Sequence, residues 1–358
     1  TLFIFKQLNF MKGRALGFDR EQKLILRVKS NLSHLRRDFK DIKGSFVQYE
    51  GIFGASVSNF VPGDKRNAWY GLWKAGMDRK GIKGFTALCC GADFVPLYRI
   101  KLLEGRGFRP DPADRNGAFI LNESGARHLG FHRPLDAVGK RYTTHYSTKT
   151  KTIIGIVKDF HYRGMKVKTE PMVLDIEPSL FSAITLKIDT HQLSQVMTNI
   201  RQVWESHFPG VPFEYSFLDE SFDQVYRYET QMGQLLRIIT LLGIIIAVLG
   251  LTGLVAFIAW KREKEIGVRK VLGATVADIV RMLSRQFVWM IISAIVIAVP
   301  LSWVAMSRWL DNFAYRTGLS PNVFILSAAA ALIVALLAVA LQGIKAAGRN
   351  PIDCLRNE

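Results

Sequence analysis

Three long runs without a charged residue fill most of the last third of this 358-residue chain, at 238–260, 287–306 and 323–341. A helix rises about 1.5 Å per residue, so roughly 20 residues cross a hydrocarbon core of about 30 Å. Buried helices of a soluble protein can be equally apolar, but here charged residues flank the three runs and enter none of them. The sequence therefore predicts three membrane-spanning helices rather than a soluble core.

The loops between these runs set the predicted orientation. Seven Lys and Arg residues stand between the first and second runs: Lys261, Arg262, Lys264, Arg269, Lys270, Arg281 and Arg285. The next loop holds only Arg308 and Arg316. Loops rich in Lys and Arg stay on the cytoplasmic side of a membrane. We therefore expect loop 261–286 and the C-terminus in the cytoplasm, and residues 1–230 outside it.

Residues 1–230 mix charged, aromatic and β-branched residues, as a globular domain does. Their short β-like runs predict strands at 24–28, 84–90, 118–121, 152–157, 172–176 and 184–188. Helical spacing predicts helices at 32–42 and 193–207, and an amphipathic stalk helix at 218–237 that continues into the first span. We predict two domains, an α+β extracytoplasmic domain at 1–230 and a three-helix transmembrane domain at 231–358.

Stripes of mostly small residues follow helical spacing on two spans, at Gly243, Ala247, Gly250 and Leu254, and at Ala331 and Ala335. Such stripes let helix backbones approach each other in lipid, which predicts a helical partner such as a second permease subunit. Pro300 lies inside the second span and predicts a kink. Because no span holds a charged residue, the sequence offers no proton relay or ion pathway, which argues against an ion-coupled transporter.

The net charge of +18 raises the question of nucleic-acid binding. The excess is spread along the chain, with 35 Lys and Arg against 24 Asp and Glu before Arg237, and 13 against 6 from there onward. No nucleic-acid-binding motif accompanies it. We therefore expect no nucleic-acid partner.

The sequence shows no constellation for catalysis or for binding a metal. The phosphate-binding pattern G-x-x-x-x-G-K-[ST] is absent, so the chain cannot hydrolyse ATP through such a loop. His128 and His132 are four residues apart, but Gly130 separates them and no third ligand is near. Cys89 and Cys90 are adjacent, which predicts small apolar residues on a strand rather than a disulfide. We expect a non-catalytic chain with no metal or cofactor site of its own.

The loop after the first span reads KREKEIGVRKVLGA over 261–274. Glu265 and Arg269 are spaced i, i+4 in the order that supports a helix, and Gly273 is expected to end that helix. Thr275 and Asp278 predict a capping box that opens a second helix. That helix is expected to turn four apolar residues toward the membrane: Ile279, Val280, Leu283 and Phe287. Two interpretations stay open, a basic loop against anionic headgroups or a docking element for a cytoplasmic partner.

The segment 261–275, KREKEIGVRKVLGAT, with the basic amphipathic helix after it, resembles the signature of the FtsX-like permease domain of MacB-type ABC transporters. The tail 350–358 is similar to the cytoplasmic ending of that family. Four segments resemble its periplasmic core domain: 91–108, 118–131, 138–142 and 154–164. The opening 5–19 is similar to the stretch after the fifth span of two-repeat, eight-span permeases of Bacteroidetes-type bacteria. The resemblance extends over essentially the whole chain.

The resemblance implies a permease of the bacterial inner membrane that exports or extracts a substrate such as a peptide, an antibiotic or a lipoprotein. A separate cytoplasmic ATPase would bind ATP and contact the coupling loop, whose residues are Lys264, Glu265, Ile266, Gly267, Arg269, Lys270, Gly273 and Ala274. Closure of that ATPase would move the stalk and the outer domain. The resemblance also implies a second permease half or a homodimer, and a periplasmic adaptor or outer-membrane channel.

The resemblance further implies four spans per permease half. This sequence has three, so the fourth is expected before Thr1. The apolar residues 1–5 are too short to span a bilayer and are interpreted as the tail of a segment cut away, with a frayed first strand as the alternative. Two other functions stay open. An FtsX-like signalling scaffold that activates a cell-wall hydrolase would use the same loop, whereas a membrane-anchored enzyme has no supporting constellation in the sequence.

Overall fold

The computed structural model describes residues 2–13, 16–64, 68–77, 79–145, 149–165, 167–225 and 227–347. The chain divides into two compact units. The outer domain is Gly13–Arg227, and the membrane unit combines Thr1–Lys12 with Tyr228–Glu358. The predicted boundary at 230 lies three residues from the observed one, but the first twelve residues group with the membrane unit instead of the outer domain. The tail 350–358, which includes Cys354, lies outside the described residues.

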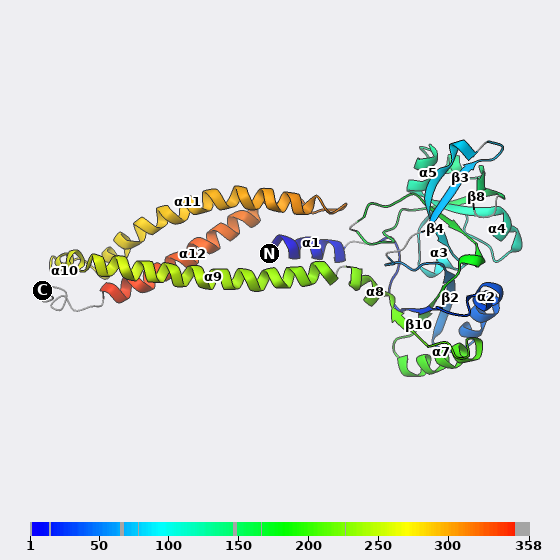
Figure 1. Cartoon of the computed structure of the whole chain (residues 1–358), viewed down its shortest axis with the longest axis horizontal. Coiled ribbons are helices and arrows are strands. Elements are labelled where there is room, and N and C mark those ends of the chain that lie inside the picture. The colour runs from blue at the N-terminus through cyan, green and yellow to red at the C-terminus, as the bar shows by residue number, and fades with distance from the viewer. Residues whose placement is uncertain are drawn as a thin grey trace. The chain divides into compact units, whose positions relative to one another are not determined.

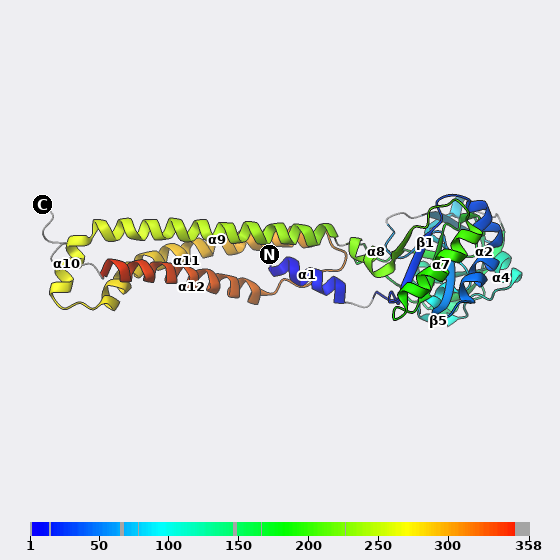
Figure 2. The same cartoon turned by 90° about the horizontal axis from the view of Figure 1, so that it is seen from below.

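A four-stranded antiparallel sheet forms one part of the outer domain, in the order β11-β1-β10-β2. Its strands are β1 (Lys23–Arg27), β2 (Ile52–Ser58), β10 (Ala183–Ile188) and β11 (Tyr215–Phe217). Helices α2 (Leu32–Val47) and α7 (Leu193–His207) pack on this sheet (Figure 2). Each buries one apolar stripe, which on α2 consists of Leu35, Phe39, Ile42 and Phe46.

A larger sheet forms the rest of the outer domain, in the order β5-β8-β6-β9-β4-β3-β7. Its strands are β3 (Trp69–Lys74), β4 (Lys83–Cys89), β5 (Leu102–Gly105), β6 (Ala118–Asn122), β7 (Arg141–Thr144), β8 (Thr150–Val157) and β9 (Met172–Asp175). Strand β7 also pairs with the start of β8, so six strands close into a ring, and β5 pairs with the end of β8. Closing a sheet in this way leaves few exposed edges.

Short helices connect these strands or, in the case of α8, follow the last of them. They are α3 (Phe94–Leu97), α4 (Pro112–Gly117), α5 (Glu123–Leu129), α6 (Pro134–Ala137) and α8 (Leu218–Val225), with 3-10 turns at Arg79–Gly81 and Pro178–Leu180.

Three polar side chains meet in the interior of the ring. Lys151 on β8 and Asp175 on β9 form an ion pair of 2.6 Å in which both side chains are 2% exposed. The Tyr70 hydroxyl on β3 donates a hydrogen bond to the same carboxylate. Burial raises the pKa of Asp175, and the contacts with Lys151 and Tyr70 act in the opposite direction. The network therefore links three strands across an otherwise apolar core.

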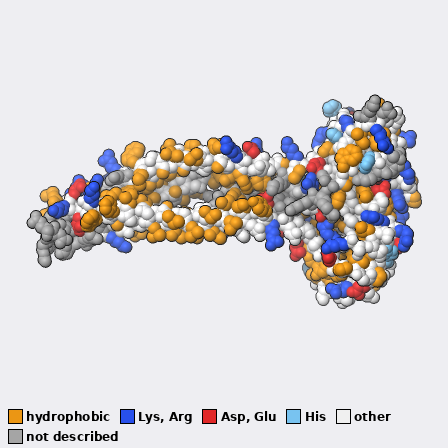
Figure 3. Space-filling model, in the orientation of Figure 1, with side chains coloured by type: hydrophobic (Ala, Val, Ile, Leu, Met, Phe, Trp, Pro, Cys, Tyr) orange, Lys and Arg blue, Asp and Glu red, His pale blue; other side chains and the backbone are white. Residues whose placement is uncertain are grey.

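The membrane unit contains α1 (Leu2–Gly13), α9 (Arg227–Lys261), α10 (Glu263–Val271), α11 (Val276–Leu310) and α12 (Pro321–Ala347). Helices α9, α11 and α12 are long and apolar enough to cross a membrane, as predicted. They run alongside one another and carry hydrophobic side chains along their length (Figures 1 and 3). The 35 residues of α9 and of α11 each span about 50 Å. Both helices therefore extend beyond a hydrocarbon core of about 30 Å.

Helix α1 packs on the loop between α11 and α12. The buried amide of Gln7 donates to the Tyr315 carbonyl oxygen and accepts from the Thr317 N–H, each at 2.8 Å. The ring of Phe3 lies 5.0 Å from that of Phe324. The alternative of a frayed first strand is therefore wrong, because residues 2–13 form a helix of the membrane unit.

The predicted stalk consists of two helices. Helix α8 ends at Val225 and α9 begins at Arg227, and Tyr226 between them lies outside the described residues. Leu218 and Phe222 are buried in the outer domain, which is why α8 belongs there rather than to a free stalk. From Arg227 onward, the rest of the stalk and the first span are one helix.

The described residues leave the small-residue stripe on α9 uncovered, since Gly243, Ala247, Gly250 and Leu254 are exposed. Ala247 also lines an apolar cavity of about 650 Å³ together with Ala331 and Ala335 of α12. The hydroxyls in its wall belong to Thr240, Ser302 and Ser327, and each bonds a carbonyl oxygen of its own helix. A helical partner on the stripe stays a prediction. Helix α11 continues through Pro300.

Candidate coupling site

The predicted coupling loop forms a helix followed by a tight turn. Helix α10 covers Glu263–Val271, and Gly273 follows with a φ of 92°, a conformation that glycine adopts without strain. The Thr275 hydroxyl then accepts from the Asp278 N–H, and the Asp278 carboxylate accepts from the Thr275 N–H. This capping box opens α11. The helix, its end and the capping box are therefore as predicted.

One face of α10 is anchored to the long helices. Ile266 is 5% exposed and packs with Ala259 of α9 and with Ile279 and Leu283 of α11. Gly267 beside it is also buried. Because α10 contacts α9 and α11 at once, a displacement of α10 would act on both helices.

The apolar face of the first turns of α11 differs from the expectation. Ile279, Leu283 and Phe287 are buried against neighbouring helices, with Phe287 packed on Val255 of α9 and Val339 of α12. Val280 is half-buried against Gly343 of α12. The prediction that these side chains face the membrane is wrong. Helical spacing identifies an apolar face, but lipid and a neighbouring helix cover such a face equally well.

The charged residues of α10 lie on its open side. Glu265 and Arg269 form an ion pair of 2.8 Å with both side chains nearly half exposed. Such exposed i, i+4 pairs stabilise a helix by about 0.3–0.5 kcal/mol. Lys264 is exposed, Lys270 and Ala274 are half-buried, and Gly273 is exposed in the turn. The predicted coupling residues therefore fall on two faces, with Ile266 and Gly267 anchoring the helix and Lys264, Glu265 and Arg269 exposed.

Three apolar residues of the coupling segment were absent from the predicted set. Val268, Val271 and Leu272 are 49%, 67% and 81% exposed, at i, i+3 and i+4 spacing. Their spacing within a run of charges was a signal available in the sequence. Together we call them the α10 apolar patch. Hydrophobic, acidic and basic side chains lie side by side at this end of the membrane unit (Figure 3).

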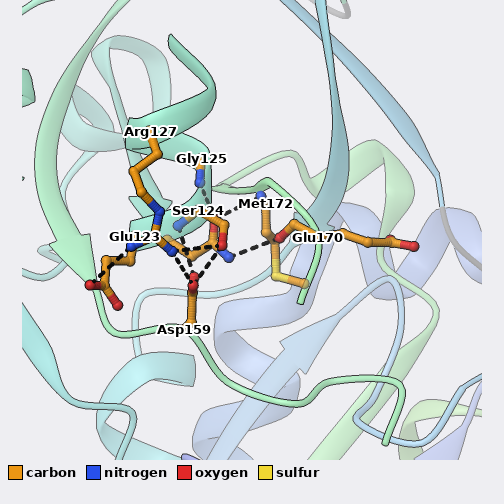
Figure 4. A network of polar contacts seen from close by, with 8 residues as sticks. Glu123, Ser124, Gly125, Arg127, Asp159, Glu170 and Met172 are labelled. Carbon is orange, nitrogen blue, oxygen red and sulfur yellow. Dashed lines mark hydrogen bonds and ion pairs between the residues drawn. The ribbon is translucent and has the colours of Figure 1, made fainter. Parts of the chain in front are cut away.

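A second polar network lies in the outer domain at the start of α5 (Figure 4). Asp159 accepts hydrogen bonds from the Ser124 N–H at 2.9 Å and from its hydroxyl at 2.5 Å, and it pairs with Arg127 at 2.8 Å. Asn122 accepts from the Gly125 N–H at 2.8 Å. These contacts satisfy free N–H groups of the first turn of α5, so the arrangement is that of a helix N-terminus.

Asn122 also joins α5 to β9. Its side-chain oxygen accepts from the Met172 N–H at 2.8 Å, and its amide donates to the Glu170 carbonyl oxygen at 2.9 Å. His128 and the two adjacent cysteines lie in the same domain: the ring of His128 is 5.2 Å from that of Phe85, and Cys89 and Cys90 are fully buried unpaired thiols. Within the described part of the chain, no three His, Cys, Asp or Glu side chains are grouped to hold a metal ion.

Replacing Asn122 with Ala is expected to lower the unfolding free energy of the outer domain by about 2–3 kcal/mol, because two buried N–H groups and one half-buried carbonyl oxygen lose their partner. The measurement uses the full-length chain with Cys354→Ser in nanodiscs. The rate at which Cys89 and Cys90 react with a thiol reagent then reports the unfolding of the outer domain. Asn116→Ala is the control, since Asn116 is exposed and its change should stay within about 0.5 kcal/mol. Equal labelling rates for the two variants would contradict the linking role of Asn122.

Comparison with known proteins connects this geometry to a family. Residues 237–351 match the FtsX-like permease C-terminal family. Over 277 residues, the chain is 23% identical to the macrolide export ATP-binding/permease protein MacB of Chromobacterium violaceum. The alignment covers 75% of this chain and 42% of that protein, so the chain spans about two fifths of the length of this relative.

Two solved structures are also similar to the chain. The periplasmic region of MacB from Actinobacillus actinomycetemcomitans has 14% identity and a TM-score of 0.40, covering 58% of this chain and 94% of that one. The extracellular domain of the ABC-type transporter YknZ from Gram-positive bacteria has 12% identity and a TM-score of 0.38, covering 54% and 98%. Residues 237–351 of the membrane unit therefore match an FtsX-like permease C-terminal domain, and the chain is similar over three quarters of its length to a MacB protein.

Proposed function

We propose that this chain is the membrane subunit of an ABC transporter and that a separate cytoplasmic ATPase docks on the α10 apolar patch. The observation that carries the proposal is the exposure of Val268, Val271 and Leu272 on a helix whose opposite face is anchored by Ile266. Exposed apolar side chains that are grouped in this way mark interaction surfaces. A lipid headgroup layer would attract the basic side chains of this loop, but it gives no reason for a turn held by Gly273 and a capping box.

The packing of α10 supports a mechanical coupling. Ile266 contacts α9 and α11, and α9 runs without a break from Lys261 to Arg227, which adjoins the outer domain in sequence. A helix of this length is stiff, so ATP-driven movement at α10 would reach the outer domain. The chain would use this movement to export or extract a substrate such as a peptide, an antibiotic or a lipoprotein. The ATPase subunit would bind the ATP, and this chain would hold no cofactor.

In this arrangement the chain lies in the bacterial inner membrane. Residues 261–286 and the C-terminus would face the cytoplasm and the outer domain would face the periplasm, in keeping with the Lys and Arg content of the first loop. A second permease half or a second copy would cover the small-residue stripe of α9. A signalling scaffold that activates a cell-wall hydrolase would have the same topology, and it differs in having no transported substrate.

Placing a charge in the α10 apolar patch should uncouple the ATPase. We expect Leu272→Glu, and Val271→Glu to a similar extent, to reduce co-purification of the co-expressed ATP-binding subunit at least tenfold, because burying an unpaired carboxylate in the interface is unfavourable. The matched control is Val47→Glu, which places the same charge on an exposed Val of α2 in the outer domain. Unchanged co-purification and ATP turnover in both patch variants would exclude this docking site.

The charged pair of α10 supplies a second arm of the same experiment. Exchanging the two residues, as Glu265→Arg with Arg269→Glu, keeps an ion pair in the helix but reverses each charge. Reduced co-purification by this double variant would show that the ATPase recognises the charges, while normal co-purification would restrict recognition to the apolar patch.

A further inference from the structure

Two neighbouring hairpins of the outer domain form a surface that the proposed ATPase docking does not use. Strands β3 and β4 make one hairpin, and β7 and β8 make the other. Strand β3 also pairs with β7, with Leu72 opposite Thr144 and Lys74 opposite Tyr142. The hairpins therefore lie side by side on the outside of the ring.

An exposed aromatic side chain occupies the centre of this surface. Trp69 is 52% exposed, although its indole lies flat on the strands. A Cβ atom at Gly71 would come within 2.6 Å of the indole, and one at Gly84 within 2.6 Å of its Nε1 atom. The two glycines therefore create the space in which Trp69 lies, and the ring of His145 packs edge-on against its indole, with centroids 4.9 Å apart.

Ile82 extends the apolar area. Its side chain would approach a Cβ at Gly71 within 2.5 Å, so Trp69 and Ile82 meet above the same glycine, and Ile82 is itself 38% exposed. Trp73, two residues further along the outer face of β3 than Gly71, lies beneath the Arg79 guanidinium, which is 5.3 Å from its ring. We call Trp69, Ile82 and the exposed cations Lys74, Arg79 and Arg141 the hairpin surface.

The hairpin surface is strongly basic. Segments 68–85 and 139–150 hold seven Lys and Arg residues and one acidic residue, Asp78. Lys74, Arg79 and Arg141 are exposed, whereas Lys83 pairs with the buried Leu72 in the register and donates to the His128 carbonyl oxygen, on the other face of β4. Lys and Arg side chains surround a hydrophobic area in the part of the outer domain that carries β3 and β4 (Figures 1 and 3).

We propose that the hairpin surface docks an acidic protein partner outside the membrane. An exposed Trp beside an aliphatic side chain, with a charged rim, has the anatomy of a protein–protein interface, in which Trp and Arg carry much of the binding energy. The excess of cations selects a partner of opposite charge and speeds the encounter. An anionic glycan would fit less well, because Ile82 occupies the position beside the indole where sugar hydroxyls need hydrogen-bond partners. The inference is independent of ATPase docking at α10.

Photo-crosslinking tests the proposal in cells that carry the full-length chain. Benzoylphenylalanine is placed at Ile82, and at the exposed Val47 of α2 as the matched control. We expect position 82, and not position 47, to capture one acidic protein that mass spectrometry identifies. Capture of only glycan or lipid at position 82, or the same products at both positions, would overturn the proposal.

The captured protein is then purified and its affinity for the full-length chain in nanodiscs is measured. Arg79→Glu with Arg141→Glu should weaken binding at least tenfold, and raising the salt from about 0.05 to 0.5 M should weaken binding by the wild type in the same direction. The control pair, Lys40→Glu with Lys158→Glu, makes the same charge change at exposed positions elsewhere in the domain. If the two double variants bind equally, the hairpin surface is not the docking site.

Discussion

Replacing Lys151 with Met should lower the unfolding free energy of the outer domain by about 3–5 kcal/mol, because the Asp175 carboxylate then stays buried without its cation. Lys151 donates to Asp175 at 2.6 Å and to the Arg115 carbonyl oxygen at 3.2 Å, so two acceptors lose their donor. The thiol reactivity of Cys89 and Cys90 under increasing urea measures the change. Both cysteines are fully buried near Asp175, and the Cys90 N–H bonds the Asp175 carbonyl oxygen at 2.9 Å.

The unfolding free energy that Lys151→Met loses should depend on pH in a defined direction. Lys151 lowers the pKa of Asp175 in the native protein, so its removal raises that pKa further above the ordinary value of 3.8. A raised folded-state pKa means that the folded state binds the proton more tightly than the unfolded state does. In Lys151→Met, protonated Asp175 therefore contributes fully to the unfolding free energy below pH 3.8. That contribution is lost as the pH rises through the folded-state pKa of Asp175.

Two further variants separate the ion pair from the fold around it. Lys158→Met removes an exposed cation one residue beyond β8 and should change stability by less than about 0.5 kcal/mol. Adding Asp175→Leu to Lys151→Met should recover much of the loss, because replacing both members of a buried pair by apolar residues is often neutral. A loss in Lys151→Met that is the same at all pH values would contradict the stated role of the pair.

The fold of the outer domain was predictable in its local parts. All six predicted strands and both predicted helices are present, because alternation and helical spacing are local signals. The sequence prediction missed β2, β3, β5, β7 and β11, which are short or interrupted by glycine. The ring closure by β7 and β8 was also not predictable. Strand order depends on contacts between distant segments, and a Lys on a strand is ordinarily exposed, so nothing local indicated that Lys151 pairs with Asp175.

The coupling loop shows the same difference between local features, which were predictable, and contacts between distant segments, which were not. Its helix, its end at Gly273 and the capping box were predicted, because each depends on residues within four positions of one another. The burial of Ile279, Leu283 and Phe287 was not, because it depends on α9 and α12 packing against α11. The membrane spans were the clearest prediction, since a run of about 20 apolar residues has few other uses.

Gly105→Ala is expected to cost about 3–5 kcal/mol of unfolding free energy, since two effects add. Gly105 has a φ of 75°, which costs an L-residue about 1–2 kcal/mol. A Cβ there would also lie 2.3 Å from the Ile154 carbonyl oxygen, a backbone atom that cannot move without disturbing β8. Gly155, opposite Gly105 in the register, is equally crowded, because its Cβ would lie 2.3 Å from the Arg106 carbonyl oxygen.

Gly139→Ala separates these two effects. Gly139 has a similar φ of 83°, but no atom lies within 4 Å of the position of its Cβ. Gly139→Ala should therefore lose only the cost of a positive φ, about 1–2 kcal/mol of unfolding free energy. The difference between the two variants in the Cys89 and Cys90 labelling assay then measures the cost of separating β5 from β8. If Gly105→Ala and Gly139→Ala lose the same stability, the conformation of Gly105 alone explains why glycine occupies this position of β5, and the close approach of the two strands contributes nothing.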